Sequence, residues 1–258
     1  QFDLSFDFQL FSKKSIYNAV EYAIAAFQLI ENMEAHLNAF LDDIFEFSAE
    51  DQFDYSHVLL ANGATWRRNG LGRIHREPIP GLDKLQVFTP DDIMDGVLAK
   101  GRVVVFDDDH FYMGGAIAEL LRKSGCDVTL VTPASEISSY TAKTLEQHAI
   151  QKRLLELGVS LETAHNLRSV SSSTAEIECI YTGRVREIEC FASVLVTMRT
   201  PIDTLWKSNP NLDRIGDVMG PSTIAAAIYS GHLYAQELGS PTSNEVPFRR
   251  ELIDLSMN

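Results

Sequence analysis

The sequence predicts an α/β fold, because segments typical of buried strands alternate with segments typical of helices. The clearest unit is RVVVFDDDHFYMGGAIAELLRKSGCDVTLVT at 102–132, which predicts a strand, a turn, a helix and a second strand. This order is typical of a Rossmann-like dinucleotide-binding unit. Buried-strand patterns at 57–64 and 194–197 and a helix pattern at 221–238 extend the alternation.

The turn of this unit is acidic where a dinucleotide-binding turn is rich in glycine. It contains Asp107, Asp108 and Asp109, although a pyrophosphate needs free N–H groups and close approach to the backbone. If Gly114 is the third glycine of G-x-G-x-x-G, Asp109 and Phe111 stand at the other two positions. The carboxylates would repel a phosphate. The turn therefore predicts a unit that keeps its helix packing without its phosphate site.

A metal site is the rival interpretation of the three aspartates, because carboxylate oxygens bind divalent cations. No further acidic residue at a fixed spacing completes such a site, so we expect no metal. The three cysteines, Cys126, Cys179 and Cys190, are too far apart in sequence for a zinc ribbon or an iron–sulfur ligand run. Reduced thiols and a cytoplasmic location fit this pattern best.

Composition excludes several classes of partner. The 258 residues are 45% hydrophobic and 22% charged, as in ordinary globular proteins. The formal net charge of -14 disfavours nucleic acid and anionic membrane surfaces, which attract clustered basic residues. No apolar run is long enough to span a bilayer, and the start of the sequence lacks the pattern of a signal peptide.

Residues 1–50 have a pattern of their own. Strict alternation over 1–11 predicts a half-buried strand, and apolar residues from Ile16 to Ile44 then recur at steps of four and three. This seam could form a coiled coil or helical hairpin that makes a homodimer, or a long helix packed on its own sheet.

A short helix is expected to begin at Pro90. Thr89 is a favourable N-cap, and Asp91 and Asp92 suit the positive end of the helix dipole. These two carboxylates therefore have a structural explanation.

The region after the acidic unit combines a helix with strands. A helix is expected over 138–157 and a strand over 159–164. Alternating segments at 175–181 and 184–190, separated by the Thr182–Gly183 turn, predict a β-hairpin or meander.

Four local motifs carry a resemblance to a known family. They are ANGATWRRNG at 61–70, FDDDHFYMGG at 106–115, TLEQH at 144–148 and IGD…STIAAAIYSGH at 215–232. With them, the sequence resembles the C-terminal region of the trimethylamine, dimethylamine and histamine dehydrogenase group, relatives of NADH:flavin oxidoreductases and old yellow enzyme. In this group the acidic turn is itself a family feature.

The resemblance implies a Rossmann-like flavoprotein fold, a three-layer sandwich with two dinucleotide-binding domains. An FAD/ADP-domain-like part would comprise 51–88 and 197–258, and an inserted NAD(P)-domain-like part would comprise 89–196. Residues 1–50 would form a separate N-terminal strand and amphipathic helix. The first nucleotide half is incomplete, because its glycine fingerprint is missing.

The resemblance also implies where ADP or FAD would bind, weakly if at all. The implied cofactor-binding positions lie at two turns and one helix start: Asn62, Gly63, Gly216, Asp217 and Thr223. Asn62 replaces the threonine of the family's Ala-Thr-Gly turn. Asp217 could accept a ribose hydroxyl, or it could cap the backbone of Gly220 or Ser222.

The family's complete enzymes carry FMN in an N-terminal barrel and a four-iron (4Fe-4S) cluster, and this sequence contains neither the barrel nor the cysteine run. It also shows no nucleophile–base motif, so we expect no catalytic residue here. The resemblance thus implies a C-terminal module of a flavin-dependent amine dehydrogenase-type oxidoreductase, inactive alone, with the catalytic barrel domain as partner. The alternative is a non-catalytic interaction or dimerisation protein that reuses the fold.

Overall fold

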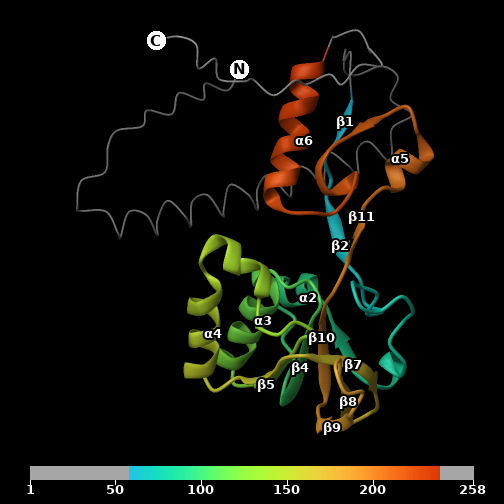
Figure 1. Cartoon of the computed structure of the whole chain (residues 1–258). Helices are drawn as coiled ribbons and strands as arrows, with labels where there is room; N and C mark the ends of the chain where they lie inside the picture. Colours follow the sequence, from blue (N-terminus) through green and yellow to red (C-terminus); the bar gives the residue numbers. More distant parts are fainter. Residues whose placement is uncertain (1–57, 239–258) are drawn as a thin grey trace, which may run out of the picture. The chain divides into compact units, whose positions relative to one another are not determined.

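A five-stranded parallel sheet forms the core of the chain in the computed structural model, which describes residues 58–238 (Figure 1). The strand order is β3-β10-β4-β5-β6. The strands are β3 (Gln86–Phe88), β4 (Arg102–Asp107), β5 (Asp127–Val131), β6 (Ser160–Glu162) and β10 (Ala192–Val196). The expected strand over 1–11 and the apolar seam that follows it lie outside the described residues.

The order of the strands creates a reversal beside β4. The chain leaves β4 toward β5 and β6, whereas β10, which is much later in sequence, pairs with the other edge of β4. In open α/β sheets, ligands bind outside the carboxyl ends of the strands at such a reversal. The acidic turn follows β4 directly and therefore lies at this position.

Helices cover one face of the sheet. They are α2 (Pro90–Met94), α3 (Tyr112–Lys123) and α4 (Gln147–Glu156). Val103 and Val105 of β4 share a hydrophobic core with Ile117 and Leu121 of α3 and with Leu154 of α4. The predicted strand–turn–helix–strand order over 102–132 is confirmed.

A three-stranded antiparallel sheet covers the other face. Its strands are β7 (His165–Val170), β8 (Thr174–Cys179) and β9 (Val185–Glu189), so the predicted meander is confirmed. Val104 and Phe106 of β4 pack with Leu167 and Ile177 of this sheet. Successive residues of β4 thus alternate between two buried faces, which explains its continuous apolar run.

The remaining elements form two small sheets and their helices. In the first, β1 (Leu59–Leu60) pairs in parallel with β12 (Asp213–Arg214); in the second, β2 (Ala64–Trp66) pairs antiparallel with β11 (Arg199–Pro201). The helical segments near them are α5 (Thr204–Ser208), η3 (Gly216–Val218) and α6 (Ile224–Glu237), whereas η1 (Leu82–Lys84) contacts β3 and β7. None of the helices between residues 58 and 238 is long and apolar enough to cross a membrane.

The single helix predicted over 138–157 is wrong in its first half. That segment is a 3-10 helix, η2 (Ser139–Thr144), followed by α4. Ser138 and Leu145 bracket η2 with φ of 50° and 64°, and these left-handed conformations end a regular helix. The sequence pattern contained no glycine or proline to mark either break.

The helix start at Pro90 is as predicted. Thr89 donates its backbone N–H to Oδ2 of Asp92 at 2.7 Å, which completes a capping box. Oδ2 of Asp91 accepts the N–H of Trp66 at 2.8 Å, so both carboxylates serve the structure.

Replacing Gly114, in the first turn of α3, should destabilise the protein. A Cβ there would lie 2.5 Å from Cγ of Asp107, whereas a Cβ at Gly231 of α6 would make an ordinary contact at 3.5 Å. We expect Gly114→Ala to lower the free energy of unfolding by about 1–3 kcal/mol. Gly231→Ala is the matched control and should raise it by about 0.5–1 kcal/mol through helix propensity. Denaturant unfolding tests both, and a stabilising Gly114→Ala would contradict the packing.

Candidate functional site

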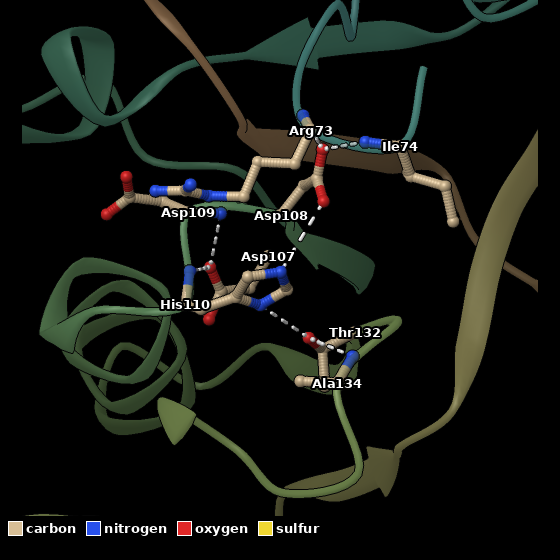
Figure 2. A network of polar contacts seen from close by, with 8 residues as sticks. All are labelled: Arg73, Ile74, Asp107, Asp108, Asp109, His110, Thr132 and Ala134. Atoms are coloured by element: carbon tan, nitrogen blue, oxygen red, sulfur yellow. Dashed lines mark hydrogen bonds and ion pairs between the residues drawn. The ribbon is translucent and has the colours of Figure 1, made fainter. Parts of the chain in front are cut away.

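The acidic turn follows the carboxyl end of β4 and is hydrogen-bonded to the carboxyl end of β10. Figure 2 shows the polar contacts of its side chains. Asp107 is the last residue of β4, and both Asp107 and Asp108 are fully buried. The backbone N–H groups of Asp108 and Asp109 both donate to the carbonyl oxygen of Val196, at 2.9 and 3.1 Å. The turn is therefore fixed on the strand pair where a dinucleotide would bind.

The Asp107 carboxylate accepts hydrogen bonds from the turn itself. Its Oδ1 accepts the N–H groups of Asp109 and His110 at 3.1 and 3.0 Å. Its Oδ2 has no hydrogen-bond partner among residues 58–238 and lies against Gly114. Burial raises the pKa of Asp107 to about 7, although the two N–H donors oppose the shift. The carboxyl thus occupies the position before α3 where a phosphate would meet the backbone.

The Asp108 carboxylate fastens a second segment over the turn. Its Oδ2 accepts the N–H groups of Arg73 and Ile74, the latter at 3.0 Å. A Cβ at Gly72 would overlap this oxygen, so the close approach requires glycine. Burial raises the pKa of Asp108, opposed by the Ile74 and Arg73 N–H groups and by the charge of His75. We call this contact between Asp108 and residues 72–74 the latch.

His110 completes the buried polar cluster. It has φ of 67°, and its Nε2 lies 3.6 Å from Oδ1 of Asp108. Its Nδ1 lies 3.4 Å from the hydroxyl of Thr132, which also accepts the N–H of Ala134 at 3.3 Å. Burial, helped by the charge of Arg73, lowers the pKa of His110 to about 4. The imidazole is therefore neutral at pH 7, and its contact with Asp108 is not a charged pair.

Two arginines offset the charge of the turn. Burial raises the pKa of Asp109, and the charges of Arg199 and Arg73 oppose this shift. Figure 2 shows the Arg73 side chain beside Asp109, and its guanidinium also lies 5.1 Å from the ring of Tyr140. Arg73 and Arg199 come from segments distant in sequence, so the sequence pattern did not bring them to the site.

Arg199 also binds the turn before α6. Its guanidinium pairs with Oδ2 of Asp217, donates to the carbonyl of Ser222 and lies 5.5 Å from the ring of Trp66. Oδ1 of Asp217 accepts the N–H of Ser222 at 3.1 Å, which is one of the two capping contacts considered from the sequence. Both carboxylate oxygens of Asp217 are thus engaged within the chain.

The five expected cofactor positions lie near the carboxyl ends of β1 and β12. Because these strands pair in parallel, the turn after Leu60 and the turn after Arg214 meet at one edge. The side-chain amide of Asn62 donates to the carbonyl of Ile202 at 2.9 Å, and the carbonyl of Gly63 accepts the N–H of Ile202 at 3.0 Å.

Gly216 and Asp217 lie in η3, and Thr223 directly precedes α6. The N–H of Gly216 donates to the hydroxyl of Ser230 at 2.8 Å. Thr223 is the N-cap of α6, and its hydroxyl accepts the N–H of Ala226 at 3.3 Å. A cofactor role for these residues remains a prediction.

The described residues do not supply a metal or iron–sulfur centre. Across residues 58–238, no three His, Cys, Asp or Glu side chains come together in a group that could hold a metal ion. All three cysteines are free thiols. Cys126 and Cys190 are buried in separate hydrophobic clusters, so they do not form a shared ligand set.

Comparisons with known proteins identify relatives of this architecture. Residues 88–199 match the model of the OYE-like second alpha/beta domain. The chain is 30% identical over 244 residues to dimethylamine dehydrogenase of Hyphomicrobium sp. (strain x), covering 81% of this chain and 32% of the relative.

Solved structures give the same picture. Histamine dehydrogenase from Rhizobium sp. 4-9 is 40% identical with a TM-score of 0.72, and the match covers 77% of this chain and 33% of that one. The 6-hydroxypseudooxynicotine amine oxidase from Pseudomonas geniculata N1 is 37% identical with a TM-score of 0.70, covering 73% and 30%. The chain spans about a third of the length of these relatives.

The raised pKa of Asp107 makes stability depend on pH. Since its folded pKa of about 7 exceeds the ordinary 3.8, its stabilising contribution is complete below pH 3.8 and is lost as the pH rises through 7. Asp107→Asn removes this loss. The free energy of unfolding of the variant minus that of the wild type should therefore increase by about 1–3 kcal/mol from pH 5 to pH 8. Denaturant unfolding at both pH values measures the difference.

The control for that experiment is Asp83→Asn, which alters an exposed aspartate of η1. It should keep the pH dependence of the wild type. His110 titrates with the opposite sign, because its pKa is lowered, but it is present in all three proteins and its effect cancels in the comparison. If the free energy of unfolding of Asp107→Asn changed with pH in parallel with that of the wild type, the raised pKa of the buried Asp107 carboxyl would be contradicted.

The latch predicts a local effect of Asp108. In Asp108→Ala the N–H groups of Arg73 and Ile74 lose their acceptor, so hydrogen exchange at Ile74 should accelerate by about 10-fold or more. Asp109→Ala is the matched control, because the Asp109 side chain accepts neither of these N–H groups. Equal exchange at Ile74 in both variants would argue against the latch.

Proposed function

We propose, from the homology of this chain to dimethylamine dehydrogenase and histamine dehydrogenase, that it is a C-terminal module of an oxidoreductase of that type. The parent enzyme would be a flavin-dependent amine dehydrogenase or NADH:flavin oxidoreductase, with its redox chemistry on FMN and an iron–sulfur centre outside residues 58–238. The module would have a nucleotide-binding-like fold whose acidic turn binds no nucleotide. One observation carries this last part of the proposal: four N–H groups at the acidic turn donate to the chain's own carboxylates.

The hydrogen bonds of the turn support this assignment. Two N–H groups, of Asp109 and His110, donate to Asp107, and two more, of Arg73 and Ile74, donate to Asp108. A phosphate would have to displace a carboxylate from each pair. It would also add negative charge beside three aspartates, at a cost of about 4 kcal/mol for one charge pair at 4 Å and intermediate dielectric.

The fold of the module is consistent with two Rossmann-like parts, of which one is complete and the other lacks a nucleotide-binding half. The unit β4-α3-β5 belongs to the NAD(P)-domain-like part, whereas β1, β12 and α6 belong to the FAD/ADP-domain-like part, which lacks its first nucleotide half. β3, at the end of the expected 51–88 segment, pairs with β10 and so shares the sheet of the NAD(P)-like part. The proposed boundary therefore lies before Gln86.

ADP or FAD at the second edge would bind weakly or not at all. Asp217 is paired with Arg199 and caps Ser222, and the Thr223 hydroxyl caps Ala226. A ribose hydroxyl or phosphate would have to compete with these contacts, which leaves little gain in binding free energy.

No residue is proposed as catalytic. His110 is the residue of the turn that could serve as a general base, yet its side chain is only 11% exposed and its ring lies between Asp108 and Thr132. A general base must reach the proton of a substrate. The alternative of a dimerisation protein depends on the apolar seam within residues 1–50, which is outside the described part of the chain.

Ligand binding by the purified chain tests the proposal. The expected protein is colourless and gives no saturable heat with NADH, and at most weak heat with ADP or FAD, because the donors of both edges are occupied. Absorbance spectroscopy for flavin and titration calorimetry measure this. A stoichiometric flavin spectrum, or tight saturable NADH binding, would overturn the assignment. An in-frame upstream barrel with a cysteine run would distinguish a module of a longer enzyme from an interaction protein.

A further inference from the structure

Residues 69–79 form a compact loop between β2 and η1 whose two ends are held together. The carbonyl of Asn69 accepts the N–H of Ile79 at 3.0 Å. A Cβ at Gly70 would overlap the Ile79 side chain, which is buried in the hydrophobic cluster that contains Phe106. A loop with its ends in contact and no helix or strand of its own is an Ω-loop. We call Asn69, Gly70 and Ile79 the base of the loop.

The tip of the loop, residues 72–76, makes few apolar contacts. The N–H of Gly72 donates to the carbonyl of His75 at 3.1 Å, which makes the tip a closed turn. The half-buried His75 ring meets the ring of Phe106 edge-on, with 5.7 Å between the centroids. The other side chains of the tip are exposed: Arg73, Ile74 and Arg76. A segment with few buried apolar contacts opens at a smaller cost in free energy than the core of a protein.

The latch is the main polar contact of the tip. Figure 2 shows the N–H groups of Arg73 and Ile74 converging on one carboxylate oxygen, Oδ2 of Asp108. The Arg73 guanidinium adds a cation–π contact with the ring of Tyr140, at 5.1 Å from its centroid. The tip is therefore fastened at its far end, whereas the base is fastened by its own hydrogen bond and by buried apolar packing.

The closed tip covers residues that directly follow two strands of the parallel sheet. A Cβ at Gly72 would overlap Oδ2 of Asp108, the residue after β4, and would lie 3.3 Å from Cβ of Thr197, the residue after β10. Asp108 is 0% exposed and Thr197 is 4% exposed. The tip thus shields both side chains from water.

Three polar atoms at this contact have no hydrogen-bond partner within residues 58–238. They are Oδ1 of Asp108, Oγ1 of Thr197 and Nε2 of His75. Nε2 of His110 lies 3.6 Å from Oδ1 of Asp108, which is too long for a hydrogen bond. Buried polar atoms without partners cost free energy that contact with water restores. Hydration of these atoms therefore opposes closure of the tip.

We propose that residues 69–79 are a lid, whose tip opens about the fixed base and admits water to Asp108 and Thr197. Opening breaks the latch and the two ring contacts, whereas the base keeps its hydrogen bond and the buried Ile79 side chain. Water then reaches the three polar atoms and offsets part of the lost contacts, so the lid opens far more often than the whole domain unfolds. This inference goes beyond the proposed function and does not depend on whether a nucleotide binds.

Hydrogen exchange on the full chain, followed at increasing urea below the unfolding transition, tests the lid. Protection of the Arg73 and Ile74 amides should be about 10-fold or more below that of the Ile79 amide. Their exchange should also depend little on urea, because opening the tip exposes little surface. The Ile79 amide and those of β4 should exchange through larger openings, with a steep dependence on urea.

Gly72→Ala opens the tip without touching the base. The new Cβ would overlap Oδ2 of Asp108, so protection at Ile74 should fall by about 10-fold or more while that at Ile79 stays unchanged. Trypsin should cleave after Arg73 about 10-fold faster, as identified from the fragment masses. Gly220→Ala is the matched control, because a Cβ there meets no atom within 4 Å, and it should change neither result. Unchanged exchange in β10 shows that each variant is folded.

Three results would overturn the proposal. The first is a wild-type Ile74 amide that is as well protected as the β4 amides and equally sensitive to urea. The second is an Ile79 amide as poorly protected as that of Ile74, which would mean that the whole loop unfolds from its base. The third is unchanged exchange at Ile74 in folded Gly72→Ala. The first two need only the wild type, and none uses a nucleotide, so their failure is distinguishable from failure of the proposed function.

Discussion

The contact between the buried Asp107 carboxyl and the start of α3 governs the rest of the site. Its Oδ2 lies against Gly114, and its Oδ1 accepts the N–H groups of Asp109 and His110. The side chain therefore lies before the helix and takes up two N–H groups of the turn that leads into it. The Asp108 carboxylate also accepts backbone N–H groups, so the latch holds residues 72–74 against the acidic turn.

Burying two adjacent aspartates beside a third that is half-buried is costly, and the structure shows how the cost is offset. Four backbone N–H groups solvate two of the carboxylates, and Arg73 and Arg199 supply positive charge near the third. Asp107 still has a pKa near 7, so it is partly protonated at neutral pH. His110 has a left-handed backbone conformation. Such a conformation costs about 1–3 kcal/mol and persists only where surrounding contacts fix it.

Sequence patterns predicted the elements of the fold better than the contacts of the site. The apolar run before Asp107 and the Gly114–Ala118 spacing were enough to predict β4 and the packing of α3. The break at Leu145 was missed, because its left-handed backbone is held by the loop and not by a residue type that favours it. Arg73 and Arg199 were missed because tertiary structure alone brings them to the turn, and no local spacing encodes that.

We propose that the chain's own carboxylates take the place of a nucleotide at the edge of β4 and β10. Amide chemical shifts of Asp109, His110 and Ile74, recorded while NADH is added to the full chain, test it most directly. We expect these shifts to stay constant at millimolar NADH, because the corresponding N–H groups already donate to Asp107 and Asp108. Saturable shifts of Asp109 and His110 would show that a dinucleotide displaces the carboxylates, and would contradict the account.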